Sequence, residues 1–302
     1  MDLQALALAA GLAGYIPAPV ATPRSVPAMK AAPAVVTVVA APSGEIAGWD
    51  AFVTSLLAAR VIAVGEKHDE SSHHQVQARV LAAVAERDSN LVVGLEMVSQ
   101  DQQPALDGFL SGKTSEADFA IWWKKHWGFD FSIYKPIFDA ARAKNLKIVG
   151  LNAPIALVKA VAKKGLSGLT PEERAALPAS IQESSDARYR DFVKDSLSGH
   201  GLPPESIARM IEAQAVWNET MGAKTAALAA AGPRVLVVAG QGHMLWRAGI
   251  PESAARRGAG PAAVVLPYPL DGESVPIPDQ LKRLRDPASG DLALADDFVL
   301  IP

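Results

Sequence analysis

The stretch Val61-Ile62-Ala63-Val64-Gly65-Glu66-Lys67-His68-Asp69 decides the fold, because an apolar run meets a cluster of acidic and imidazole side chains there. Its first four residues are apolar and mostly β-branched, which predicts a buried strand. Gly65 ends that strand, and a helical pattern follows from Ser71 to Glu86. A strand that stops at glycine, passes through a polar turn and enters a helix is half of a βαβ unit. Ligands of open α/β sheets bind outside the carboxyl ends of the strands, so the cluster stands where this fold carries chemistry.

The composition excludes several classes of protein and of functional site. The chain has 302 residues and is 49% hydrophobic, which is typical of a globular protein with a sizeable core. A net charge of −3 and a pI of about 6.1 argue against a nucleic-acid binder that relies on a basic surface. The absence of cysteine excludes disulfides, cysteine-ligated zinc, iron–sulfur clusters, thiol catalysis and an acylated lipobox on this chain.

Two parts of the chain differ in character. Residues 1–43 are expected to form a disordered or signal-like leader and a proline-rich linker, since the apolar run from Leu3 to Ile16 is too short for a bilayer and lacks a basic start. Residues 44–302 are expected to form a single α/β domain that begins with a helix at Ile46 to Ala59. We predict a mostly parallel central sheet flanked by helices, with an inserted all-helical cap at about 99–231. The predicted strands are 61–64, 91–96, 146–151, 234–239, 262–266 and 297–301.

A Gly-x-x-His pattern occurs twice, at Gly65-Glu66-Lys67-His68 and at Gly240-Gln241-Gly242-His243, and each follows a predicted buried strand. Glu96 ends another apolar run and would lie at the same edge as Glu66 if their strands are parallel neighbours. The residues expected to converge are therefore Glu66, His68, Glu96 and His243. Imidazole and carboxylate groups suit a divalent metal ion, with His68 and His243 as ligands, and they also suit acid–base catalysis. The alternative is that these histidines only cap helices or bond loop backbone; the recurrence of the pattern favours a site.

Further histidines follow on the next predicted helix. His73 and His74 lie about 100° apart around a helix, so at most one of them can share a site with His68.

One face of a later helix is mixed in polarity. Gln214, Trp217, Asn218 and Met221 lie at positions i, i+3, i+4 and i+7. A buried amide without a partner costs about 1–3 kcal/mol, so we expect this face to contact a polar cleft or a ligand as well as the core.

An aromatic run extends from Trp122 to Tyr134 and includes Trp123 and Trp127. It could line a pocket for a large planar ligand, although aromatic residues at helical spacing also pack beneath caps. The phenol of Tyr134 could ligate ferric iron.

Taken together, these motifs resemble the ChaN-like family of haem-binding uptake proteins, part of a superfamily with erythromycin-esterase-like and Tiki/TraB-like proteins. The resemblance covers about residues 44 to 301. The matching segments are Gly65 to Asp69 with His73-His74, Leu95-Glu96-Met97 with Gln102-Gln103, Trp123, Trp127, Tyr134 to Ile137, Gly150 to Pro154, Gln214, Trp217 to Met221, and Gly240 to His243.

The resemblance implies haem held between a helical cap and the sheet edge, with a tyrosine as iron ligand and two chains paired around stacked haems. Tyr134 matches that ligand because it stands in the family's Tyr-x-Pro motif. The resemblance also implies iron acquisition at the bacterial cell envelope or periplasm, with a transporter as partner. The chain departs from the family in having no cysteine to acylate, and its Gly240 to His243 segment is closer to the second histidine motif of hydrolytic relatives.

The leading hypothesis is a haem-binding protein of iron or haem uptake. It uses Tyr134 for the iron and the residues Trp123, Trp127, Gln214, Trp217, Asn218 and Met221 around the porphyrin. The alternative is a hydrolase in which His68 or His243 acts as a base or metal ligand, while Glu66 or Glu96 orients or polarises water. A third hypothesis is a scaffold that has lost both activities.

Overall fold

A computed structural model describes residues 37–40, 43–198, 202–269 and 294–301. Their strands form one eight-stranded sheet in the order β2-β1-β8-β7-β3-β6-β4-β5. From β8 to β5 every neighbouring pair is parallel, whereas β1 pairs antiparallel with both β8 and β2. The strand bounds are β1 Thr37–Ala40, β2 Glu45–Ala47, β3 Val61–Glu66, β4 Leu91–Ser99, β5 Lys147–Asn152, β6 Arg234–Gly240, β7 Ala262–Pro269 and β8 Asp297–Ile301. The expected mostly parallel sheet is confirmed.

The order of the central strands differs from the simplest expectation. β3 and β4 are parallel, but β6 lies between them and pairs with both. Glu66 and Glu96 therefore reach the same edge from strands that are not adjacent. The strand that separates them is the one that ends in Gly240 and leads to His243.

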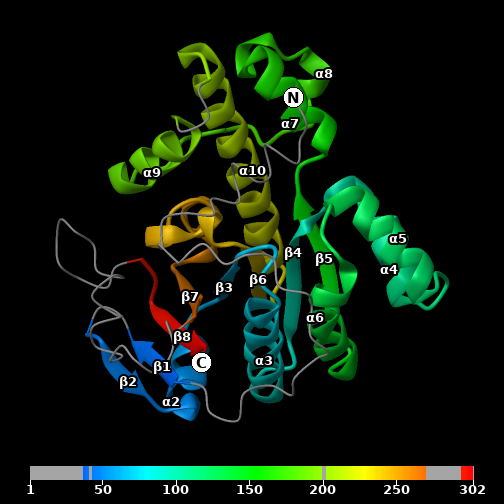
Figure 1. Ribbon diagram of the computed structural model, residues 1–302, viewed down its shortest axis with the longest axis vertical. Helices are drawn as coiled ribbons and strands as arrows, with labels where there is room; N and C mark the ends of the chain where they lie inside the picture. Colours follow the sequence, from blue (N-terminus) through cyan, green and yellow to red (C-terminus); the bar gives the residue numbers. More distant parts are fainter. Residues whose placement is uncertain (1–36, 41–42, 199–201, 270–293, 302) are drawn as a thin grey trace.

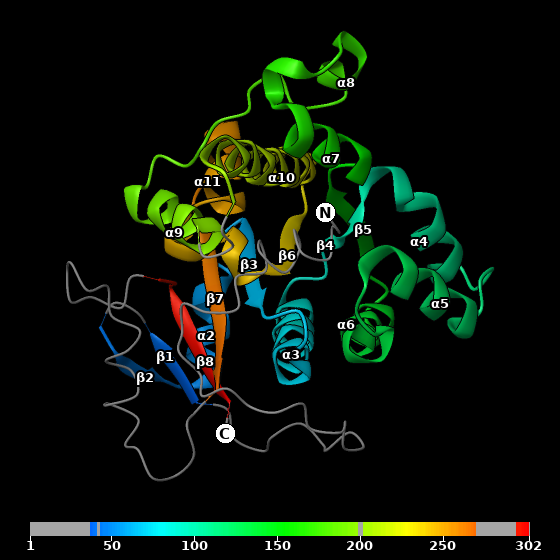
Figure 2. The ribbon, with the colours of Figure 1, turned by 45° about the horizontal axis from the view of Figure 1, so that its top comes forward.

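Helices cover both faces of the sheet (Figures 1 and 2). Two apolar clusters fill the interior, one on each face: the first packs beneath α3 and α6, the second beneath α7, α9 and α10. The helix bounds are α2 Trp49–Leu56, α3 Ser71–Arg87, α4 Gln103–Leu110, α5 Glu116–Trp127, α6 Phe131–Ala143, α7 Ile155–Lys164, α8 Pro171–Ala175, α9 Ala187–Ser198, α10 Pro204–Ala230 and α11 Ile250–Ala254.

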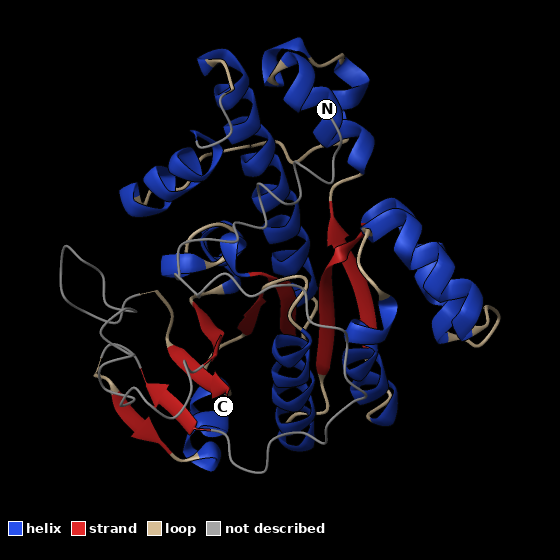
Figure 3. Cartoon of the chain, viewed as in Figure 1, coloured by secondary structure: helices blue, strands red, loops and turns tan. Residues whose placement is uncertain are grey.

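Helices of the predicted cap range thus lie on both faces. Segment 99–231 contains α4 to α6 on the side of α3, the strand β5, and α7 to α10 on the other side (Figure 3). The sheet edge stands between these two groups.

The N-terminal part of the domain differs locally from expectation. Glu45–Ala47 forms β2, not the start of a helix, and α2 begins only at Trp49. Strand β1 lies within the predicted leader 1–43 and belongs to the sheet, so residues 37–40 correct that expectation; residues 1–36 and 41–42 lie outside the described residues.

On one side of the sheet, β7 and β8 extend past the end of β3. Val64 pairs with Val265, and Val265 pairs in turn with Asp297, the first residue of β8. β7 and β8 then continue together for four more residues, to Pro269 and Ile301. β3 itself continues two residues beyond Val64, to Glu66, so at about 3.3 Å per residue β7 and β8 extend roughly 7 Å beyond its end.

None of the helices in the described ranges combines the length and apolar character that a bilayer crossing requires.

Candidate functional site

The four residues predicted to converge do so at the carboxyl edge of the central strands. Glu66 is the last residue of β3, and His68 follows it in the turn before α3. Glu96 lies in β4, and His243 lies in the 3₁₀ turn Gln241–His243 directly after β6. All four side chains are buried, and contacts connect them in two pairs.

Glu66 pairs with two imidazoles. His68 Nδ1 lies 2.6 Å from Glu66 Oε1, and His74 Nδ1 lies 2.7 Å from Glu66 Oε2. The His74 contact is an ion pair rather than a well-aligned hydrogen bond, since Oε2 has no hydrogen-bond partner by geometry. His74 is held further by Gln77 Oε1 at 3.1 Å and by the carbonyl oxygen of His68 at 3.3 Å. Of the two adjacent histidines on α3, His74 is therefore the one that joins the site.

The contacts of Glu66 with His68 and His74 shift the pKa values of all three side chains. Burial alone would raise the pKa of Glu66, but the charges of His74 and His68 outweigh it and lower that pKa to about 2. Burial alone would lower the pKa of His68, yet the Glu66 carboxylate raises it to about 9. The pKa of His74 is also raised, for the same reason. At neutral pH the Glu66 carboxylate therefore pairs with the His68 imidazolium, and the same carboxylate favours the protonated form of His74.

His73 has the opposite environment, and burial lowers its pKa to about 3. Its Nδ1 accepts a hydrogen bond from the backbone N–H of Lys67 at 3.1 Å. It is a neutral support for the turn that carries His68.

Glu96 pairs with the second imidazole. His243 Nε2 lies 3.1 Å from Glu96 Oε1, and the backbone N–H of Gly240 donates to Glu96 Oε2 at 2.6 Å. Burial alone would raise the pKa of Glu96, but the charge of His243 and these hydrogen bonds lower it.

The other nitrogen of His243 contacts the cap helices. His243 Nδ1 lies 2.7 Å from Asn218 Oδ1 on α10, and Gln214 Nε2 of the same helix lies 3.3 Å from it. Asn218 Nδ2 donates to the hydroxyl of Tyr189 at 3.0 Å, and that hydroxyl donates to the carbonyl of Gly242 at 2.7 Å. The imidazole is therefore fixed from both sides, with Nδ1 toward the cap and Nε2 toward Glu96.

Gly240 lets the two pairs approach each other. A Cβ at this position would lie 2.8 Å from His68 Cε1 and 3.5 Å from Glu96 Oε2. Only a residue without a side chain allows the backbone after β6 to lie against His68.

The aromatic residues form the wall on the side of α3. Tyr134 is buried, and its hydroxyl accepts a hydrogen bond from Trp127 Nε1 at 2.9 Å. The same hydroxyl lies 3.3 Å from Glu66 Oε1 and 3.2 Å from the carbonyl oxygen of His68, so its one proton is shared between them. Half-buried Trp127 and Phe129 lie against the imidazole of His68, with ring centroids 4.9 Å and 5.4 Å away. Trp123 is fully enclosed behind Tyr134.

The predicted ligand residues thus divide into two groups. Tyr134, Trp123 and Trp127 belong to the wall beside Glu66 and His68. Gln214, Trp217, Asn218 and Met221 belong to the wall beside His243, where Trp217 lies edge-on to the imidazole at 6.2 Å and Met221 packs in the core.

Among the described residues, no group of three or more histidine, aspartate or glutamate side chains is arranged to hold a metal ion. The predicted divalent ion at His68 and His243 is therefore without a matching ligand group in this part of the chain.

Two important residues were missed by the sequence reasoning. Tyr189 gave no signal, because a single tyrosine on an amphipathic helix is indistinguishable from core. His74 could have been selected over His73 through Gln77, which lies three residues later on the same helical face.

Comparisons with known proteins identify the family and support the fold. The family model described as haem-binding uptake, Tiki superfamily, ChaN matches residues 52–253. Among curated proteins, no sequence matches the chain significantly.

Solved structures with a similar fold include ChaN of Campylobacter jejuni with cofacial haem binding. It is 21% identical with a TM-score of 0.63, and the match covers 87% of this chain and 96% of that one. A mutant of the erythromycin esterase EreC in its open conformation is 16% identical with a TM-score of 0.46, over 87% of this chain and 82% of that one. The type III effector HopBA1 is 11% identical with a TM-score of 0.48, over 83% of this chain and 91% of that one.

Proposed function

Because the chain belongs to the haem-binding uptake family of the Tiki superfamily that includes ChaN, we propose that it binds haem and serves in haem or iron uptake. The observation that carries the proposal is the wall beside His68, where a phenol stands behind half-buried aromatic rings at the sheet edge. Phenolate is a haem-iron ligand in proteins, and aromatic rings pack on a porphyrin. The donor set therefore fits haem.

Tyr134 would ligate the iron once its hydroxyl is released from Trp127. Burial and the charge of Glu66 raise the pKa of Tyr134 well above its usual value, so the phenol is protonated without a ligand. Ferric iron favours the phenolate, and the phenolic proton must leave on ligation. The His68 carbonyl and Glu66 stand next to that proton, and Trp127 is the side chain that must move to expose the oxygen.

The cellular location and the partners are inferred from the family. We propose that the protein works at the bacterial cell envelope, where it would pass haem to or from a transporter, and that two copies pair around their haems. The structure of ChaN from Campylobacter jejuni is described as showing cofacial haem binding, which supports this proposal.

Hemin titration of the purified full chain tests the proposal. We expect a saturable Soret shift for the wild type, and Tyr134→Phe to weaken binding at least about tenfold, which corresponds to about 1.4 kcal/mol. The matched variant Tyr268→Phe, at a buried tyrosine on β7, should bind hemin like the wild type. A Soret spectrum and affinity unchanged in Tyr134→Phe would contradict ligation by Tyr134; the absence of any saturable shift would contradict haem binding.

A second candidate function is supported by the two buried imidazole–carboxylate pairs. We propose, as the alternative, hydrolysis by proton transfer. His68, kept protonated by Glu66, would donate a proton to a leaving group, and the Glu96–His243 pair would accept one from water. Trp217 Nε1 and Gln241 Oε1 are buried near His243 without a hydrogen-bond partner among the described residues, which is consistent with water or a polar substrate at this point.

Hydrolysis of short-chain p-nitrophenyl esters distinguishes this alternative. A hydrolase should exceed the buffer rate, and His243→Asn should lower that rate by about 100-fold or more. His126→Asn, at an exposed histidine on α5, is the matched control and should leave the rate unchanged. If the wild type, His243→Asn and buffer alone all hydrolyse the ester at the same rate, ester hydrolysis at this site is ruled out.

A further inference from the structure

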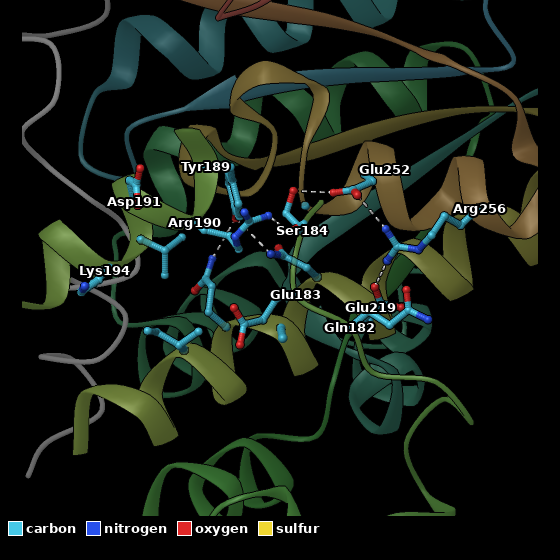
Figure 4. Close-up of a pocket in the computed structure, with 16 residues that line it drawn as sticks. Gln182, Glu183, Ser184, Tyr189, Arg190, Asp191, Lys194, Glu219, Glu252 and Arg256 are labelled. Carbon is cyan, nitrogen blue, oxygen red and sulfur yellow. Dashed lines mark hydrogen bonds and ion pairs between the residues drawn. The ribbon is translucent and has the colours of Figure 1, made fainter. Parts of the chain in front are cut away.

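A separate cavity lies between α9, α10 and α11 (Figure 4). Its volume is about 240 Å³. Ligand pockets usually measure about 300–1,000 Å³, so this one suits a molecule of one ring rather than an iron-porphyrin.

The inner wall of the cavity is neutral and polar. Tyr189, Gln214 and Asn218 line it, and they are only 3%, 5% and 6% exposed. Asn218 Nδ2 and Gln214 Nε2 both donate to the Tyr189 hydroxyl, at 3.0 Å and 3.4 Å. Gln214 lines the cavity, and its Oε1 can accept a hydrogen bond from a ligand that carries N–H or O–H groups. Apolar surface completes the wall, from Val193, Ile211 and Ala215.

The deeper charged residues of the cavity neutralise one another. Glu252 accepts hydrogen bonds from Ser184 and Ser185 and pairs with Arg256 at 3.0 Å. Arg256 also pairs with Glu219, which is buried and bound by Arg257 as well. A charged ligand would lose its hydration here without finding an uncompensated partner, which is unfavourable.

The rim does not select a charge. It carries two acidic residues, Glu183 and Asp191, and two basic ones, Arg190 and Lys194. Arg190 donates to the carbonyls of Ser184 and Ser185, and Asp191 and Lys194 point away from the polar cluster in Figure 4.

The inner wall is connected directly to His243. From Tyr189, hydrogen bonds lead through Asn218 to His243 Nδ1 and also to the carbonyl of Gly242. A ligand group that forms a hydrogen bond to Tyr189 or Gln214 therefore competes with the hydrogen bonds that hold the His243 imidazole in place.

We propose that this cavity is a binding site for a small uncharged molecule that carries an amide or hydroxyl group on an apolar body. Its occupancy is transmitted to His243 through Tyr189 and Asn218. The site is separate from the haem wall and does not depend on the haem proposal.

Three probes of nearly equal shape test the ligand class on the full chain: benzamide, benzoate and benzylamine, which are neutral, anionic and cationic. NMR of histidine ring nitrogens labelled with ¹⁵N reports binding near His243. The His243 signal is assigned as the one that is lost in His243→Asn. We expect a saturable shift with benzamide at a Kd of about 1 mM, and at least about tenfold weaker binding of both ions. Equal or tighter binding of either ion, or no saturable response to benzamide, would overturn the proposal.

Two variants test the place and the coupling. Ala215→Leu fills the cavity and should abolish benzamide binding, whereas Ala227→Leu, on the exposed side of α10, should not. Tyr189→Phe removes one hydrogen-bonding group of the site, so it should weaken benzamide binding; at benzamide concentrations that calorimetry shows to be saturating, the shift at His243 should be several-fold smaller than in the wild type. Binding that survives Ala215→Leu would overturn the location, and an undiminished His243 shift in Tyr189→Phe would overturn the coupling.

Discussion

Glu66 contributes to stability because it neutralises two buried imidazoles. Its two oxygens face His68 and His74, and Tyr134 adds a third neighbour at 3.3 Å. Removing one member of a buried ion pair is strongly destabilising, since the remaining charge is left without compensation.

We predict that Glu66→Gln lowers the free energy of unfolding by about 3 kcal/mol near neutral pH. The folded pKa of His68 is raised from 6.5 to about 9, so the stabilisation from its charge is complete below pH 6.5 and is lost as pH rises through 9. The folded pKa of Glu66 is lowered from 4.5 to about 2, so its share is complete above pH 4.5 and is lost as pH falls through 2. Urea unfolding of both proteins across this range measures the difference.

The control is Glu86→Gln, at an exposed glutamate that pairs with Lys144 on the surface. It should change stability by less than about 1 kcal/mol. If Glu66→Gln and Glu86→Gln have equal effects at pH 7, Glu66 does not have the assigned role.

Gly240 gives a second prediction at the scale of one residue. Gly240→Ala places a methyl group 2.8 Å from His68 Cε1, so His68 or the backbone must shift, and we expect a loss of about 1–3 kcal/mol. Gly48→Ala has no neighbour within 4 Å and is the control; it changes only the N-cap of α2 and should cost less than about 1 kcal/mol. A Gly240→Ala protein as stable as the wild type would show that the approach is not tight.

The sequence allowed Glu66, His68, Glu96 and His243 to be placed together, because one rule puts the carboxyl ends of parallel strands at one edge. It could not identify Tyr189, whose role depends on α9 crossing over the turn after β6. That contact spans 53 residues in the chain and has no local pattern.

At the scale of elements, α10 is the main connection between the cap and the sheet. It packs on α7 and α11 and carries both residues that contact His243 Nδ1. The sequence predicts this helix from Pro203 to Ala231, within one residue of the observed bounds, because Pro204 starts it and Gly232 follows its end. Its polar stripe was also predicted, since buried amides require partners.

Glu219 fixes α10 against the segment after α11, where it pairs with Arg256 and Arg257. Its side chain is 2% exposed, so Glu219→Ala leaves two partly buried cations without their carboxylate. We predict a loss of about 3 kcal/mol in urea unfolding. The control Glu205→Ala removes an exposed acidic residue in the first turn of the same helix and should cost about 0.5 kcal/mol. Equal losses in the two variants would contradict the assigned role of Glu219.

At the scale of the whole molecule, strand order was the part of the fold that the sequence left open. Hydrophobic runs identify strands, but they do not specify which strand inserts between two others. Here β6, which lies more than 130 residues after β4 along the chain, pairs between β3 and β4. The convergence was nevertheless predictable, because parallel strands share their carboxyl edge whatever their order.

β8 joins the parallel sheet to β1, and it contributes the buried residues Phe298, Val299 and Leu300. We predict that a chain ending at Ala295 aggregates, since the edge of β7 would lose its partner and those apolar side chains. A chain ending at Ile301 keeps β8 and should elute as the full chain does in size-exclusion chromatography. Equal elution and melting temperature for the two truncations would show that β8 is dispensable.

Strands β7 and β8 determine the position of Thr37, the first residue of β1. Thr37 pairs with Leu300, and Leu300 lies next to Tyr268, three residues beyond the level of Val64. Thr37 therefore lies on the side of the molecule that bears Glu66 and His243. If a bead or a lipid were attached at Thr37, His68 and His243 would face the surface of that bead or membrane. If it were attached at the amino ends of the parallel strands, these imidazoles would face away from it.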